Sequence, residues 1–293
     1  MKIWTYKRYG SPDVLELTER ELPEPTGDEV LVKIHAASLN AYDWHLLRAD
    51  PFVVRLGGMG FFRPKNGTLG ADIAGTVERV GDAVTELKPG DAVFGTLSPT
   101  GSGGFAEFAL GRERYLAPMP KETSFAEAAA IPMAATTALQ GLRDVGSVSI
   151  GKRVAINGAS GGVGTFAVQI AKALGADVTA ICSSAKVDQA RELGADRVID
   201  YRSEDFTKSD TEYDMIFGVN GFRRLSSYRR VLKPRGIYVM AGGSNRQIFQ
   251  GALLGSLMSK KGGKTFRAVM EKPNKADLLT LAKMIESGAI RPV

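Results

Sequence analysis

The stretch that decides the fold is Asn157–Gly164, NGASGGVG, which stands between the apolar run RVAIN and the amphipathic run TFAVQIAKALG. A glycine-rich turn between a strand and a helix is typical of pyrophosphate-binding loops. Without a side chain, Gly161 lets the backbone approach a diphosphate, and Gly164 allows close packing of the helix, although Ala159 replaces the first glycine of the usual GxGxxG pattern. The helix N-terminus adds free N–H groups and a positive dipole. All eight residues are predicted to line a dinucleotide site: Asn157, Gly158, Ala159, Ser160, Gly161, Gly162, Val163 and Gly164.

The chain beyond Gly151 alternates between short β-branched runs and helical runs. The predicted strands are RVAIN, DVTAIC, RVID, YDMIFGV and GIYVMAG, and the predicted helices are TFAVQIAKALG, KVDQARELG and RLSSYRRVL. This alternation is typical of βαβ units, so a doubly wound parallel sheet is expected. Gly175 and Gly194, each in the sequence LGAD, are expected to end two successive helices.

The first 119 residues have a different texture, with short apolar or alternating runs separated by Gly, Pro and Asp. This pattern predicts a mainly β domain. A helical region follows over residues 124–142, where Ser124 and Glu127 have the spacing of a capping box. Pro132 is expected to divide this region into two helices.

The composition bounds the class of protein. The chain has 293 residues, of which 44% are hydrophobic and 24% charged, which suggests two globular domains. No apolar run approaches the roughly 18 residues that cross a bilayer, and the N-terminus does not resemble a secretory signal, so a cytoplasmic protein is expected. The single cysteine, Cys182, excludes an intrachain disulfide and a multi-cysteine metal site. The net charge of +6 is dispersed along the sequence, which disfavours a nucleic-acid partner.

The residues after the second predicted strand bear on the choice of cofactor. In NAD-specific folds an acid about 20 residues after the glycine motif binds the ribose 2′-hydroxyl. No acid stands there in this chain; the segment ICSSAK offers the hydroxyls of Ser183 and Ser184 and the cation of Lys186. These groups suit a 2′-phosphate, so NADPH is predicted over NADH. The alternative is that Ser184 merely caps the next helix.

The segment NGASGGVGTFAVQIAKALGADVTAICSSAKVDQARELGADRVIDY resembles the cofactor domain of zinc-free quinone oxidoreductases in the medium-chain dehydrogenase/reductase superfamily. Earlier segments resemble landmarks of the same superfamily in order, namely YKRYG, PDVLEL, DEVLVKIHAASLNAYDWH, LGADIAGTVERVG, KPGDAVFG and GGFAEFAL. The resemblance implies an α/β protein with a GroES-like β domain and a Rossmann domain, with substrate in the cleft between them. The expected domains are residues 1–119 (GroES-like), 120–262 (Rossmann, binding NADPH) and 263–293 (last Rossmann strand and returning helix). Relatives are commonly dimers or tetramers, so a homo-oligomer is expected.

The resemblance also implies further cofactor-binding residues. Lys186 and Tyr201 match positions that line the 2′-phosphate in such relatives. The loops VNG and AGG match segments beside the nicotinamide ribose and ring. The residues placed at the cofactor on this basis are Val219, Asn220, Gly221, Ala241, Gly242 and Gly243, and Thr137 is assigned with them.

The catalytic residues expected from the resemblance are Asn40, Tyr42 and His45. Asn40 takes the place of the first zinc-binding cysteine of related alcohol dehydrogenases, and Ala71 takes the place of their histidine. We expect no metal, because one cysteine and two histidines are too few for the usual zinc ligand set. Asn40 is expected to donate to the oxygen that gains charge, while packing is as plausible as proton donation for Tyr42 and His45. Trp44 is expected in the core.

The function expected from these residues is an NADPH-dependent reductase of quinones or α,β-unsaturated carbonyls that acts without zinc. The alternative is a cofactor-binding scaffold or peripheral membrane-associated protein with little catalysis. Relatives continue past the position of the final IRPV with segments that complete the catalytic domain, so we expect either that the protein continues beyond this sequence or that its catalytic domain is shortened.

Overall fold

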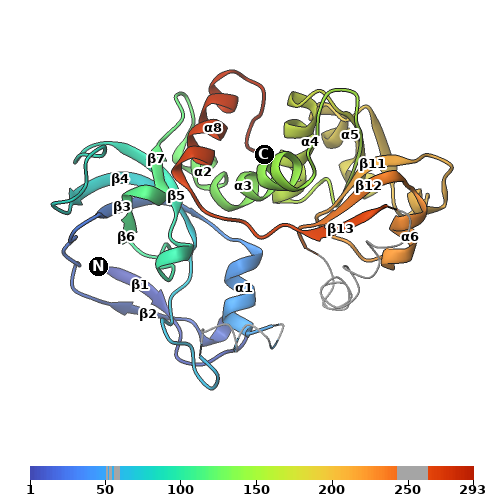
Figure 1. Cartoon of the computed structure of the whole chain (residues 1–293). Helices are drawn as coiled ribbons and strands as arrows, with labels where there is room; N and C mark the ends of the chain where they lie inside the picture. The colour runs from blue at the N-terminus through green and yellow to red at the C-terminus, as the bar shows by residue number, and fades with distance from the viewer. Residues whose placement is uncertain (51, 53–54, 56–59, 243–262) are drawn as a thin grey trace. The chain divides into compact units, whose positions relative to one another are not determined.

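The computed structural model describes residues 1–50, 52, 55, 60–242 and 263–293 (Figure 1). It divides into two compact units, of which the first contains Met1–Met133 and Pro273–Glu286 and the second contains Ala134–Lys272 and Ser287–Val293. The second unit begins later than the residue 120 expected from the sequence, because the helix after residue 124 packs on strands of the first unit.

The first unit is built on an antiparallel five-stranded sheet with the order β6-β3-β4-β5-β7. A separate antiparallel pair, β1-β2, lies in the same unit. Its strands are β1 Lys2–Thr5, β2 Glu16–Glu19, β3 Glu29–Ser38, β4 Asp72–Val80, β5 Ala92–Thr96, β6 Phe108–Arg112 and β7 Leu116–Pro118. Its helices are α1 Ala41–Arg48, α2 Phe125–Ala129 and α8 Lys275–Glu286.

The core of the first unit is formed by apolar side chains of its central strands, which carry continuous buried runs. Val30, Val32, Ile73, Val93 and other buried residues of β3, β4 and β5 form one apolar cluster. Helix α2 packs on β3, β4 and β5, and helix α8 contacts β7. The predicted capping box is present, since Ser124 Oγ accepts from the N–H of Glu127 at 3.2 Å and the Glu127 carboxylate accepts from the N–H of Ser124 at 2.8 Å.

The second unit contains a parallel six-stranded sheet with the order β10-β9-β8-β11-β12-β13. The doubly wound topology predicted from the sequence is therefore confirmed. Its strands are β8 Arg153–Asn157, β9 Asp177–Cys182, β10 Arg197–Asp200, β11 Tyr213–Gly218, β12 Leu232–Met240 and β13 Thr265–Ala268. Its helices are α3 Pro132–Gln140, which begins at the end of the first unit, α4 Gly162–Ala173, α5 Val187–Glu192 and α6 Leu225–Arg230.

The helices of the second unit end close to where the sequence predicts, but α4 begins at Gly162, three residues before the predicted start at Thr165. Pro132 begins α3 and so separates it from α2. Gly175 and Gly194 follow α4 and α5 with φ angles of 80° and 96°, a left-handed conformation that glycine adopts without strain. Helices α4 and α5 pack on β8, β9 and β10, and α6 packs on β12. Buried aromatic rings fill the core under α6, where Tyr228 and Tyr238 stack at 4.7 Å.

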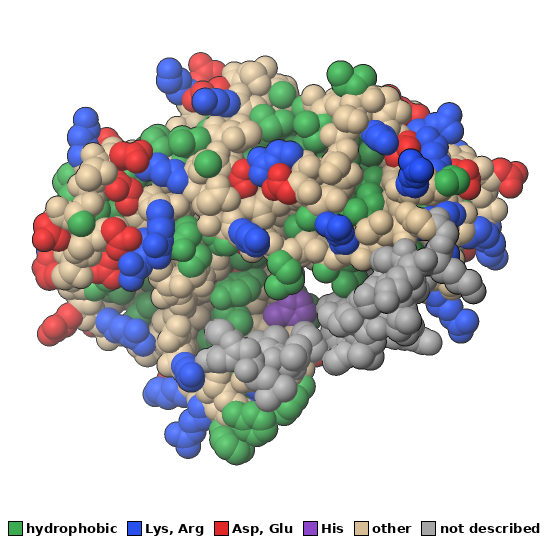
Figure 2. All heavy atoms as spheres, viewed as in Figure 1, with side chains coloured by type: hydrophobic (Ala, Val, Ile, Leu, Met, Phe, Trp, Pro, Cys, Tyr) green, Lys and Arg blue, Asp and Glu red, His purple; other side chains and the backbone are tan. Residues whose placement is uncertain are grey.

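The charged side chains do not gather into a basic stripe on the face shown in Figure 2, where Lys and Arg are interspersed with Asp and Glu. Within the described part of the chain, no helix is long and apolar enough to cross a membrane.

Candidate functional site

The loop that joins β8 to α4 contains glycines of two kinds. Gly158 and Gly164 are packed against backbone, because a Cβ on Gly158 would lie 2.9 Å from the N atom of Asn220 and a Cβ on Gly164 would lie 2.1 Å from the carbonyl oxygen of Gly158. Gly158 also has a φ of +99°. Gly161 and Gly162 are exposed instead, and the nearest atoms to an added Cβ are 3.9 and 3.8 Å away. The loop is therefore closely packed against backbone at Gly158 and Gly164. It has free space at Gly161 and Gly162, which form its open side.

The open side of this loop is the N-terminus of a twelve-residue helix. Gly161 is the N-cap of α4, and Val163 lies half-buried in its first turn. The first N–H groups of a helix have no intrahelical acceptor and point along its positive dipole. A side chain at Gly161 would fill the space in front of these groups, so the loop fits a diphosphate in both shape and charge.

A cavity of about 290 Å³ lies beside this loop, in the second unit. Six of the predicted cofactor residues line it, namely Asn157, Gly158, Ser160, Ser183, Tyr201 and Asn220. Ile181, Cys182 and Phe222 also line it and were not predicted. Phe222 directly follows the predicted VNG loop, and its ring meets that of Tyr201 edge to face at 5.8 Å. Phe222 could have been predicted as a cofactor-site residue from its position directly after that loop in the sequence.

Asn157 and Ala159 have buried side chains, and they position the neighbouring strand ends through hydrogen bonds. Asn157 is only 2% exposed, and its Nδ2 donates to the hydroxyl of Tyr228 at 2.9 Å. Its carbonyl oxygen accepts from the N–H groups of Val219 and Asn220, both at 3.0 Å. The side chain of Ala159 is buried, and its N–H donates to the carbonyl oxygen of Ile181. These bonds hold the ends of β8, β9 and β11 together.

The loops after β11 and β12 are adjacent, as their predicted common role requires. The N–H groups of Ala241 and Gly242 both donate to the carbonyl oxygen of Gly218, and a Cβ on Gly242 would lie 2.6 Å from the carbonyl oxygen of Val219. Gly221 is buried. Gly243 lies outside the described residues.

Thr137 lies on α3 in the second unit, half-buried. It is one turn beyond Ala134, whose Cβ is the nearest atom to a Cβ built on Gly162. Thr137 is therefore on a helix that borders the open side of the loop.

The corner after β9 differs from what the sequence suggested. Ser183, Ser184 and Lys186 follow the strand as expected, and Lys186 is exposed. However, an acid is present, because parallel pairing places Asp200 of β10 opposite Cys182. Ser184 Oγ donates to Asp200 Oδ2 at 2.5 Å, and this hydrogen bond lowers the pKa of Asp200. The end of β9 itself has no acid, as the sequence indicates, and the carboxylate at this corner comes from the neighbouring strand β10.

In the first unit, Asn40 lies at the junction of β3 and α1 with its side-chain nitrogen already bonded. Asn40 Nδ2 donates to Ser38 Oγ at 3.1 Å and to Asp72 Oδ2 at 3.0 Å. An amide nitrogen has two hydrogens, so both are in use. The Asn40 backbone N–H donates to Asp43 Oδ2 at 2.8 Å, and Asp43 Oδ1 accepts from the N–H of Gly70 at 2.8 Å.

Asp72 and Asp43 are buried carboxyl groups that sequence reasoning missed. Asp72 Oδ2 also accepts from the N–H of Met133 at 2.9 Å, at the start of α3, whereas its Oδ1 has no partner among the described residues. Burial raises the pKa of Asp72 to about 7, despite the lowering effect of its hydrogen bonds. Burial also raises the pKa of Asp43. Their acidic character was visible in the sequence, but their burial was not.

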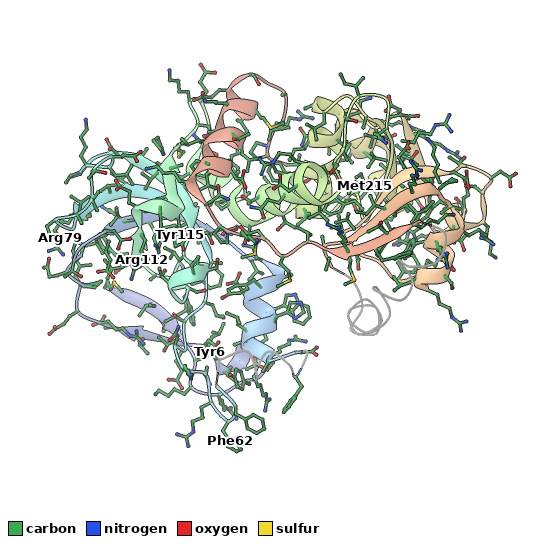
Figure 3. The ribbon with its side chains drawn as sticks, viewed as in Figure 1. Tyr6, Phe62, Arg79, Arg112, Tyr115 and Met215 are labelled. Carbon is green, nitrogen blue, oxygen red and sulfur yellow. The ribbon has the colours of Figure 1, made fainter. Side chains whose placement is uncertain are left out.

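Tyr42 and His45 lie on α1 but are not directed at Asn40 by any described hydrogen bond. The ring of Tyr42 packs with Tyr6, which Figure 3 labels, and with Leu46 and Leu47 of α1; burial raises the pKa of its phenol. His45 Nδ1 donates to the carbonyl oxygen of Asp50, and its ring stacks on Trp44 at 3.8 Å. Trp44 is 40% exposed, so its assignment to the core was wrong.

No group of three or more His, Cys, Asp or Glu side chains in the described residues is arranged to bind a metal ion. Ala71, which was expected to take the place of a zinc-binding histidine, is fully buried. His35 is bonded to Thr76 Oγ1 at 3.0 Å and lies against the ring of Phe125.

Comparisons with known proteins agree with this architecture. Residues 26–121 match the alcohol dehydrogenase GroES-like domain, and residues 162–279 match the zinc-binding dehydrogenase family. The chain is 40% identical over 230 residues to 2-methylene-furan-3-one reductase of Solanum lycopersicum, covering 74% of this chain and 56% of that protein. It is 34% identical over 306 residues to the NADPH-dependent alkenal/one oxidoreductase, chloroplastic, of Arabidopsis thaliana, covering all of this chain and 71% of that protein.

Among solved structures, the quinone oxidoreductase from Coxiella burnetii superposes with a TM-score of 0.86 at 29% identity, covering 99% of this chain and 89% of that one. The first curated relatives are much longer than their matched part, since the chain spans 56 to 58% of their length.

Proposed function

Because this chain belongs to the quinone oxidoreductase branch of the medium-chain dehydrogenase/reductase superfamily, we propose that it transfers hydride from NADPH to quinones or α,β-unsaturated carbonyls. The main support is the loop at Gly161, with its open side at a helix N-terminus and a cavity of about 290 Å³ beside it. A glycine-rich turn in this context fits a dinucleotide far better than a structural turn.

The chain's own residues have defined tasks in this proposal. The N-terminus of α4 binds the diphosphate, and the walls formed by Tyr201 and Phe222 enclose the adenosine part. When bound, NADPH supplies a hydride, so the acceptor gains two electrons and then takes a proton from solvent. Most of the rate acceleration comes from binding the cofactor and the acceptor in fixed positions, because a bimolecular step then becomes effectively unimolecular.

Asn40 contributes the polar contact at the acceptor in this proposal. Its Nδ2 is already bonded to Ser38 Oγ and Asp72 Oδ2, so an acceptor oxygen has to replace the neutral Ser38 hydroxyl. That exchange is favourable once the oxygen gains negative charge, because charge-assisted hydrogen bonds are stronger than neutral ones. Asn40→Ala should therefore lower turnover more than NADPH affinity. An unchanged rate of single-turnover NADPH oxidation would mean that Asn40 has no part in the reaction.

Zinc independence is part of the proposal and follows from the donor set. Asn40 and the fully buried Ala71 stand where zinc relatives place ligands, and Cys182, the only cysteine, is in the second unit. Metal analysis of purified protein should find far less than one zinc per chain. Turnover that is lost in a chelator and restored by added zinc would contradict this part.

The deciding experiment is NADPH oxidation measured with a panel of quinones and α,β-unsaturated ketones. We expect steady turnover with at least one member of the panel and none with simple alcohols and NADP⁺. The alternative, a cofactor-binding scaffold, predicts a change in nicotinamide fluorescence without any turnover. Asn40→Ala serves as the matched variant, since it leaves the cofactor loop untouched.

We also propose a cytoplasmic homo-oligomer, a dimer or tetramer, that binds small molecules and not nucleic acid. The dispersed charges support the absence of a nucleic-acid partner (Figure 2).

The relative from Arabidopsis thaliana is named chloroplastic, so cell fractionation is the experiment that tests the proposed cytoplasmic location. Analytical ultracentrifugation of the purified protein measures the oligomeric state, and a single species at the monomer mass would contradict the proposal.

A further inference from the structure

The corner where β9 and β10 end contains a carboxylate with both oxygens engaged. Asp200 Oδ2 accepts from Ser184 Oγ at 2.5 Å, and Asp200 Oδ1 accepts from the N–H of Arg202 at 3.0 Å. Strand register places Asp200 opposite Cys182, and the next residue, Tyr201, lines the cavity beside the loop that joins β8 to α4. The acid therefore lies at the corner where Rossmann folds bind the adenosine ribose.

The charges at this corner oppose one another. The Ser184 hydroxyl and Arg202 lower the pKa of Asp200, so the carboxylate is ionised at neutral pH. Lys186 ends the short 3-10 turn that Ser184 begins, and Arg202 follows Tyr201; both cations are exposed. A phosphate monoester brings about −1.5 to −2 charges, so the cations attract it while Asp200 repels it.

We propose that Asp200 is the specificity-determining residue of the adenosine corner, limiting the preference for NADPH so that this chain also binds NADH. The inference deepens the proposed function and rests on its cofactor site. With NADPH bound, Ser184 has to leave its charge-assisted hydrogen bond to Asp200 before it can donate to the 2′-phosphate. With NADH bound, the neutral 2′-hydroxyl donates to Asp200, the interaction that an acid provides in NAD-specific folds.

The test compares dissociation constants for NADPH and NADH, measured by nicotinamide fluorescence without any acceptor. The wild type should bind NADPH no more than about tenfold more tightly than NADH. Asp200→Asn should increase this ratio about tenfold, because NADPH loses a repulsion and NADH loses an ionised acceptor. A wild-type ratio above about a hundredfold, or an unchanged ratio in Asp200→Asn, would overturn the inference.

The control is Asp188→Asn, which removes an exposed carboxylate from the neighbouring helix α5, where Asp188 pairs with Arg191 at 3.1 Å. This variant should leave the ratio within about twofold of wild type, and a shift as large as that of Asp200→Asn would overturn a specific role for Asp200. Thermal melting of each variant checks the fold, and Asp200→Ser provides a second substitution that also removes the charge.

A further variant separates the effect of the negative charge of Asp200 from the effect of its hydrogen bond to the Ser184 hydroxyl. In the Asp200→Asn background, Ser184→Ala should weaken NADPH binding about fivefold and leave NADH binding nearly unchanged, because the released hydroxyl then donates to the phosphate. An equal loss for both nucleotides would overturn this part. The binding measurements use no acceptor, so they are independent of turnover. If the variants show the expected changes in affinity but the protein has no turnover, the proposed reaction is refuted, whereas the role of Asp200 in cofactor specificity is supported. If neither nucleotide binds, the inference is overturned together with the cofactor site.

Discussion

The loop that joins β8 to α4 and the surroundings of Asn40 are built from different groups, the first from backbone and the second from side chains. The loop at Gly158–Gly164 uses backbone, and its glycines are required because added Cβ atoms would meet atoms of Asn220 or the carbonyl oxygen of Gly158, or would occupy the open side. The surroundings of Asn40 use side chains, namely two buried acids that accept hydrogen bonds from Asn40, Gly70 and Met133. A backbone site is insensitive to pH and intolerant of added atoms. A site made of buried acids is sensitive to pH and to the loss of one partner.

The largest expected effect is a pH dependence of stability that arises in the Asn40 surroundings, whereas the loop at Gly158–Gly164 contains no titratable side chain. Asp72 has a pKa of about 7 in the fold against 3.8 when unperturbed. Between these values the unfolded chain is ionised while the folded chain keeps the proton, so stability falls as pH rises from about 4 to 7 and then levels off. The loss is on the order of 4 kcal/mol.

Urea unfolding of wild type and Asp72→Asn at pH 4.5 and pH 8 measures this effect. Asp72→Asn lacks the titrating group, so its stability relative to wild type should rise by a few kcal/mol from the lower to the higher pH. A constant difference between the two proteins would show that Asp72 titrates normally.

A second substitution destabilises the surroundings of Asn40 by removing the hydrogen-bond acceptor Asp43. Asp43→Ala leaves the N–H groups of Asn40 and Gly70 without their partner, at a cost of about 1 to 3 kcal/mol for each donor. Asp82→Ala is the control, since this exposed carboxylate also accepts a backbone N–H, that of Gly27 at 3.1 Å. Equal losses in denaturant unfolding would remove the distinction between the two sites.

The loop is tested by adding one methyl group at two positions. Gly164→Ala places a Cβ 2.1 Å from the carbonyl oxygen of Gly158 and should cost about 1 to 3 kcal/mol of stability. Gly161→Ala has open space and should keep its stability, yet it should lose NADPH affinity because the methyl would occupy the proposed diphosphate position. Chemical unfolding and fluorescence titration separate the two outcomes. Unchanged NADPH binding in Gly161→Ala would argue against the proposed diphosphate position.

The smallest expected effect is at Lys186. Because its side chain is exposed, the loss of the proposed contact to the 2′-phosphate in Lys186→Ala should weaken NADPH binding only about tenfold and leave NADH binding unchanged. Titration with both nucleotides measures the difference. Equal weakening for the two would place Lys186 away from the phosphate.

Most of the fold could be predicted from the sequence because it depends on local patterns. The strand RVAIN, the glycine turn and the helix after it are contiguous, so one window of sequence contains the whole motif. The same holds for Ser124 and Glu127, for Pro132 and for the glycines that end α4 and α5. The scarcity of cysteine and histidine is likewise a property of composition and needs no structure.

The polar networks were decided only by tertiary structure, because their partners are distant in the chain. Ser184 and Asp200 are separated by 16 residues, Asn40 and Asp72 by 32, and Asp72 and Met133 by 61. Which acid meets which donor depends on strand order and register, and neither is encoded in a local window. The burial that raises the pKa of Asp72 arises only when these elements pack together, since no residue adjacent in the sequence determines it.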